Sequence, residues 1–95
     1  MDQALETFLS VALSADGAVD LESTRRGLPR RGPERLNELR GNFRDLIEHR
    51  RLSVREWSMI NDLDFDDEDA LYTYLGAAYE YLFEGAETPP DPPWY

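Results

Sequence analysis

The stretch FDDEDALYTYLGAAYEYLFEG, residues 65–85, decides how the rest of this chain can be arranged. Its first turn is rich in carboxylates, which the positive end of a helix dipole favours. It stops at Gly85, a residue suited to the left-handed conformation that ends many helices. We therefore expect a helix over about 66–84, with Asp66 as its N-cap and Asp69 three residues further on. This helix is the central element of the predicted fold.

Aromatic side chains cover an unusually wide arc of this helix. One line of leucines and an alanine runs along it at helical spacing, and tyrosines flank that line on both sides. An ordinary surface helix has an apolar stripe about 100° wide or somewhat more. In one interpretation the helix is packed by neighbours on two sides, which a short chain favours because it needs every large apolar residue for its core. In the other, part of the tyrosine surface is a binding face, since tyrosine is enriched at interfaces.

Three further segments show the apolar spacing of amphipathic helices. Pro33 suits the first position of one of them, after Gly32. Ser53 and Glu56 form a capping box at the start of another. These signals predict an all-α domain, a small bundle of four main helices at about 2–14, 33–49, 54–63 and 66–84.

The connection at 15–32 is the least regular part of the sequence. Gly17 suits the left-handed position that would end the first helix, and Asp20 can cap a short helix after residue 19. The following RRGLPRRGP is expected to be a basic loop, because glycine and proline interrupt it.

The C-terminal segment differs in composition from what precedes it. We expect residues 1–85 to form a single helical domain and residues 86–95 to form a proline-rich tail. Four prolines within residues 89–93 enforce an extended path. Two roles are open for Trp94: it packs back on the domain as part of a strap, or it is the aromatic tip that a free tail offers to a partner.

Charge is large and unevenly distributed. The 95 residues carry a formal net charge of −10, yet all ten basic residues are arginines between Arg25 and Arg55. The chain is thus acidic, then basic, then acidic. Either the arginines pair internally with the acidic segments, or an acidic face stays exposed. The net charge favours basic proteins as partners, and we expect no direct binding to nucleic acid or to a membrane.

Six carboxylates lie within the eight residues 62–69. They do not form an EF-hand loop, because the sixth residue counted from Asp62 is Asp67 rather than glycine, and the twelfth is Thr73. We therefore predict no dedicated metal site and no cofactor. The predicted partner-binding residues join this cluster to the aromatic surface: Asp62, Asp64, Asp66, Asp67, Glu68, Asp69, Tyr72, Tyr74, Tyr81 and Trp94.

The sequence offers no recognisable catalytic constellation. There is no cysteine, His49 is the one histidine, and no serine has a base at a diagnostic spacing. No phosphate-binding glycine loop is present. We expect no enzymatic activity. The lack of cysteine, of a signal peptide and of a long apolar run indicates a cytoplasmic protein.

Three functions remain open on these grounds. The leading one is a small acidic protein-binding inhibitor of a basic partner, such as a nuclease toxin (an immunity protein or antitoxin) or a nucleic-acid-binding effector (a phage-type acidic mimic). The second is a scaffold or adaptor that acts through self-association or its tail, as a monomer or homodimer. The third is a DNA-binding regulator built on a helix–turn–helix at 33–63, although its second helix presents few polar groups for reading bases.

Overall fold

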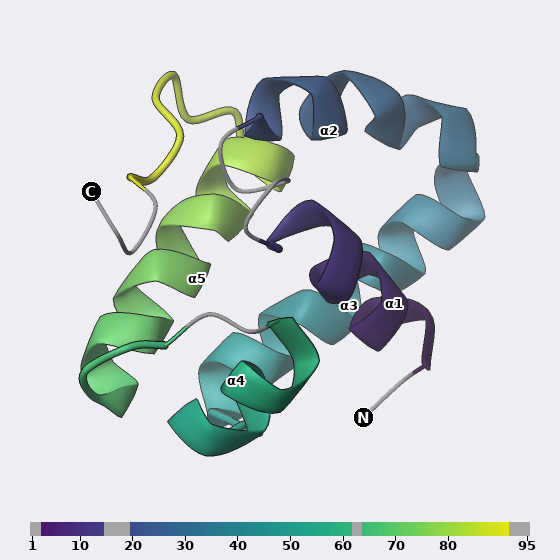
Figure 1. Cartoon of the computed structure of the whole chain (residues 1–95). Coiled ribbons are helices and arrows are strands. Elements are labelled where there is room, and N and C mark those ends of the chain that lie inside the picture. The colour runs from purple at the N-terminus through teal and green to yellow at the C-terminus, as the bar shows by residue number, and fades with distance from the viewer. Residues whose placement is uncertain (1–2, 15–19, 62–63, 92–95) are drawn as a thin grey trace.

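The structure is a computed structural model, and it describes residues 3–14, 20–61 and 64–91. This part of the chain is helical and contains no strand, which confirms the all-α prediction. The four main helices lie where the apolar spacing placed them, and a short pair of helices joins the first to the second (Figure 1). The elements are α1 (Gln3–Ala12), α2 (Leu21–Gly27), the 3-10 helix η2 (Leu28–Arg31), α3 (Pro33–His49), α4 (Val54–Asn61) and α5 (Glu68–Phe83).

Some of the sequence predictions fall on residues that the structure does not describe. Gly17, Asp62 and Trp94 lie outside the described residues, as do the predicted ends of the helices at residue 2 and residue 63.

Local end signals fix most helix boundaries as predicted. Gly32, with a φ of 87°, precedes Pro33 at the start of α3. At the start of α4, the amide of Ser53 donates to the Glu56 carboxylate over 3.0 Å, and the amide of Glu56 donates to the Ser53 hydroxyl over 3.1 Å. Gly85 has a φ of 80° just after α5, in the left-handed region predicted for it.

The start of α5 differs by one residue from the prediction. Asp67 is the N-cap, and its carboxylate accepts a hydrogen bond from the amide of Ala70 over 2.7 Å. The expectation that Asp66 caps the helix is therefore wrong. Both aspartates have a residue with a free amide three positions later, so the sequence could not separate the two registers. Asp66 is left exposed, one residue before the cap.

The basic segment after residue 24 is also different from the prediction. Instead of a loop, its first residues complete α2 and the next four form η2. Asp20 caps α2 as predicted, accepting from the amide of Ser23 over 3.3 Å. Leu21 and Leu28 explain why this segment is helical, because both are buried in the core. Their burial outweighs the glycine and proline that interrupt the pattern.

Helix α3 contacts α5, η2 and α1 and so joins the two sides of the bundle. Helix α5 lies against α3 and α2, while α1 packs on α3 and α4 (Figure 1). Phe43 of α3 is fully buried at the centre, and its ring meets Phe8 of α1 at 6.5 Å and Tyr79 of α5 at 5.6 Å between centroids. Helix α2 thus supplies part of the second side of cover that the aromatic arc of α5 requires.

Candidate functional site

The predicted site combines tyrosines with carboxylates, and the structure separates these two groups by exposure. Tyr72, Tyr74 and Tyr81 expose only 5%, 6% and 5% of their surface. Asp64, Asp66, Asp67, Glu68 and Asp69 are all exposed. The three rings belong to the core, as the first interpretation of the aromatic arc expected. We call the five exposed carboxylates the acidic surface.

Arginines account for much of the tyrosine packing. The guanidinium of Arg25 lies 4.7 Å from the centroid of the Tyr81 ring, and that of Arg50 lies 5.3 Å from the centroid of Tyr72. Arg40 donates to the hydroxyl of Tyr79 over 3.2 Å. Sequence reasoning missed these contacts. The only available signal was that all arginines lie in one segment and most tyrosines in another, which suggests pairing without indicating partners.

Tyr72 and Leu52 hold the start of α5 against the turn that joins α3 to α4. The Tyr72 hydroxyl donates to the carbonyl of Leu52 over 2.8 Å and accepts from the amide of the same residue over 3.0 Å. Both residues are buried. These two hydrogen bonds hold the N-terminal part of α5 in place. Less conformational freedom of that helix is then lost when its carboxylates bind a partner.

The carboxylates of the acidic surface differ in their local contacts. Asp64 accepts a hydrogen bond from the Ser58 hydroxyl over 2.7 Å, and Asp67 caps α5. Glu68 and Asp69 lie in the first turn of α5, where the helix dipole favours negative charge. Asp66 makes no hydrogen bond or ion pair with any described residue.

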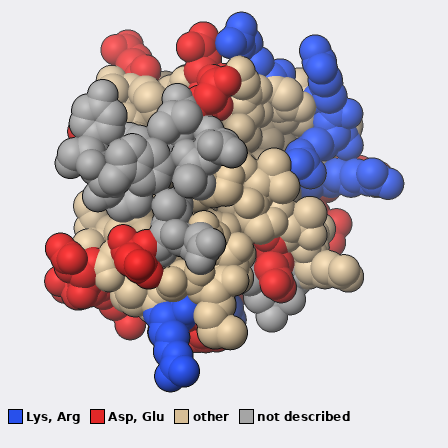
Figure 2. All heavy atoms as spheres, viewed as in Figure 1, with Lys and Arg blue, Asp and Glu red and all other residues tan. Residues whose placement is uncertain are grey.

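The acidic surface is only partly neutralised. In the described ranges, Arg50 is the one arginine that pairs with it, at 2.7 Å from Asp69 and 3.7 Å from Glu68. The hydrogen bond to Asp69 raises the pKa of Arg50, so this guanidinium stays charged. Other arginines pair elsewhere, such as Arg40 with Glu84 at 2.6 Å. Internal pairing is thus real but incomplete, and Figure 2 shows carboxylates gathered at lower left, where Figure 1 places the start of α5.

Two polar side chains of α4 are engaged by other parts of the chain. Asn61 is buried, and its side-chain amide donates to the carbonyl of Leu13 over 3.3 Å. The hydroxyl of Ser58 is engaged by Asp64. Asn61 and Ser58 thus each have a hydrogen-bond partner elsewhere in the chain.

Two further properties hold for the described part of the chain. It contains no group of three or more histidine, cysteine, aspartate or glutamate side chains arranged to hold a metal ion. None of its helices combines the length and the apolar character that crossing a membrane requires.

Comparison of the chain with protein-family models, with curated proteins and with solved structures found no match.

Proposed function

We propose that this protein is a small acidic inhibitor that binds a basic partner protein through the acidic surface. Such a partner is a nuclease toxin, in which case the protein is an immunity protein or antitoxin, or a nucleic-acid-binding effector, in which case it is an acidic mimic. The observation that carries the proposal is that Asp64, Asp66 and Asp67 are exposed and no arginine of the described residues pairs with them. On this proposal the protein acts by binding alone, in the cytoplasm.

The physical reason is complementarity of charge. Proteins that bind phosphate groups keep cationic clefts, and clustered carboxylates are attracted to such clefts at long range. Attraction of this kind raises the association rate and falls as salt is added. Helix capping explains Asp67, and the helix dipole explains Glu68 and Asp69. Asp66 is not the cap, and it has no hydrogen bond or ion pair with a described residue.

The contacts of Tyr72 with Leu52 and Arg50 support the same function, because they hold α5 in place beside the acidic surface. The Tyr72 hydroxyl bonds to Leu52 and Arg50 packs on the Tyr72 ring, so Glu68 and Asp69 project from a helix that is held against the core. Asp64, Asp66 and Asp67 lie in the segment just before that helix. Binding groups on a fixed helix lose less conformational entropy when a partner docks. In this proposal the tyrosines position the surface, and the carboxylates contact the partner.

A charge-matched pair of variants tests the proposal. The triple variant Asp64→Asn, Asp66→Asn, Glu68→Gln removes three charges from the acidic surface but keeps the Asp67 cap and the Asp69–Arg50 pair. The control Glu6→Gln, Glu38→Gln, Glu87→Gln removes three charges from exposed residues elsewhere. Affinity capture from a lysate of the source cells, read by mass spectrometry, identifies the partners of the wild type.

We expect the wild type and the control to retain a basic protein that the surface variant loses. The dissociation constant of the purified pair should rise at least tenfold for the surface variant, and also with added salt. Capture of no basic protein by the wild type would overturn the proposal, as would an equal loss of affinity in the control.

A further inference from the structure

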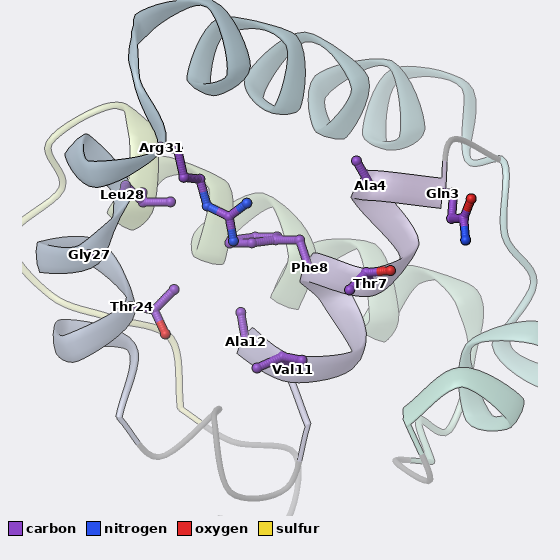
Figure 3. A pocket seen from close by; sticks show the side chains of 10 residues that line it. All are labelled: Gln3, Ala4, Thr7, Phe8, Val11, Ala12, Thr24, Gly27, Leu28 and Arg31. Carbon is purple, nitrogen blue, oxygen red and sulfur yellow. The ribbon is translucent and has the colours of Figure 1, made fainter.

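A groove of about 670 Å³ lies between α1 and α2, away from the acidic surface (Figure 3). Its floor is apolar and is made by the buried side chains of Phe8, Ala12 and Leu28. Val11 stands at its edge with 68% of its surface exposed, one of the two large apolar side chains that are exposed in the described residues. A contiguous apolar groove with an exposed aliphatic rim is typical of an interaction site.

The charge of this groove is opposite to that of the protein. The chain has 20 acidic residues, but no carboxylate is among the described residues that line the groove. Its one charged lining residue is Arg31, whose guanidinium carbon lies 5.2 Å from the centroid of the Phe8 ring. Figure 3 shows this side chain reaching from η2 across the floor toward α1.

Arg31 also stands among other arginines that lack an acidic partner. Within residues 20–61 and the other described ranges, no carboxylate forms an ion pair with Arg30, Arg31 or Arg35. All three are exposed, around the junction of η2 with α3. Six carboxylate–arginine pairs form elsewhere. Arg25 and Arg55 also lack a carboxylate partner in the described residues, but Arg31 is the arginine that lines the groove.

We propose that the α1–α2 groove is a docking site for an amphipathic helix of a partner protein, one that presents an aliphatic stripe flanked by carboxylates. The groove is open and bounded by two helices, so it suits a helix laid into it better than a small molecule, which needs a pocket that encloses most of its surface. The aliphatic stripe covers Phe8, Leu28 and Val11. A flanking carboxylate meets Arg31, where the aromatic ring already excludes water from one face of the guanidinium.

This site is independent of the proposed function. It uses other residues on other helices, and it selects the opposite charge in its partner. A protein with both surfaces would hold a basic protein at the start of α5 and an acidic helix between α1 and α2.

The test uses synthetic probes. One peptide of about 18 residues, roughly five helical turns, carries a leucine stripe flanked by glutamates, and a second carries glutamines in their place. Fluorescence anisotropy of each labelled peptide gives its dissociation constant for the full-length protein. The variants are Arg31→Gln, Val11→Asp and, as a charge-matched control on α4, Arg55→Gln. Circular dichroism of each variant checks that it is folded.

We expect the glutamate peptide to bind the wild type saturably and the Arg55→Gln variant equally well. Arg31→Gln should weaken it about fivefold, and Val11→Asp at least tenfold. The glutamine peptide should bind the wild type more weakly and be insensitive to Arg31→Gln. The triple variant of the acidic surface should bind the glutamate peptide at least as tightly as the wild type.

Several results would overturn the inference. These are no saturable binding of the glutamate peptide, equal weakening by Arg31→Gln and Arg55→Gln, or displacement of the peptide by a single-stranded oligonucleotide, which would mark the arginines as a polyanion site. Sedimentation of the free protein as a dimer that Val11→Asp dissociates would assign the groove to a second copy instead.

Discussion

Tyr72 and Tyr74 are two residues apart on α5, and both are buried, but their hydroxyls are in opposite situations. The hydroxyl of Tyr72 both donates to and accepts from the backbone of Leu52. That of Tyr74 is buried without a hydrogen-bond partner among the described residues, and its ring centroid lies 5.4 Å from that of Phe65. The same chemical group therefore stabilises the fold at one position and opposes burial at the other.

Removal of each hydroxyl should separate these two effects. Tyr72→Phe leaves the buried amide and carbonyl of Leu52 unpaired, so we expect the free energy of unfolding to fall by about 2–3 kcal/mol. Tyr74→Phe removes an unpaired group, so we expect no loss and a gain of up to about 1 kcal/mol. Urea denaturation followed by circular dichroism measures both. A loss above about 1 kcal/mol in Tyr74→Phe would show that its hydroxyl has a partner.

Alkaline pH should lower the stability of the fold through Tyr74. Burial raises the pKa of Tyr74 from 10.0 to about 12. The unfolded chain therefore loses this proton at lower pH than the folded one, and the free energy of unfolding falls between about pH 10 and 12. In Tyr74→Phe this contribution is absent, so the decline over that window should be shallower. Parallel declines in the two proteins, measured by urea denaturation at each pH, would contradict the assignment.

At the scale of single elements, the cap of α5 shows how narrowly a boundary is decided. Asp67 has an extended backbone, with φ −153° and ψ 174°, and caps the helix, while Asp66 contacts no described residue by hydrogen bond or ion pair. Asp67 alone therefore has the capping role, and the proposed function assigns partner binding to its neighbour Asp66. Asp67 stabilises the helix, and Asp66 is available for an interaction outside the molecule.

Alanine substitutions test this division. Asp67→Ala removes the acceptor for the amide of Ala70, so we expect the free energy of unfolding to fall by about 1 kcal/mol. Asp66→Ala should change it by less than about 0.5 kcal/mol, because surface substitutions away from special features have small effects. Thermal and urea denaturation of both variants provide the comparison. The reverse order of effects would restore Asp66 as the cap.

The helices could be predicted from the sequence because their signals are local. Pro33 and the Ser53–Glu56 box act within one turn, and both work in the structure as expected. Helix α2 with η2 was only half predicted, because its stability comes from Leu21 and Leu28 packing into the core. Such contacts join residues far apart in the chain, and they overrode the breaker residues that suggested a loop.

At the scale of the whole molecule, the two charges occupy different places. Exposed carboxylates gather at the start of α5, and the exposed Arg30, Arg31 and Arg35 lie around the junction of η2 with α3. Figure 2 shows arginines at upper right and carboxylates both at lower left and at the top. The acidic run was visible in the sequence, so the carboxylates of the predicted site could be named. The burial of Tyr72, Tyr74 and Tyr81 was one of two open interpretations, since nothing local tells a packed tyrosine from an exposed one.

The arginine–tyrosine contacts have a consequence for how the protein responds to denaturants. Arg25, Arg40 and Arg50 each meet a different tyrosine of α5, from three places along the chain. Guanidinium chloride supplies the same planar cation in free form, so its ions compete for the ring faces and the carboxylates that these side chains occupy. Urea is uncharged and competes less for such sites.

We therefore expect the free energy of unfolding extrapolated from guanidinium chloride to be lower, by about 1 kcal/mol or more, than that extrapolated from urea. The urea series should contain sodium chloride at matched ionic strength, because salt screens the mutual repulsion within a chain of net charge −10. Equal values would mean that the contacts add little to stability. A lower free energy of unfolding in guanidinium chloride would mean that free guanidinium ions displace the arginine side chains from their contacts with the tyrosines of α5.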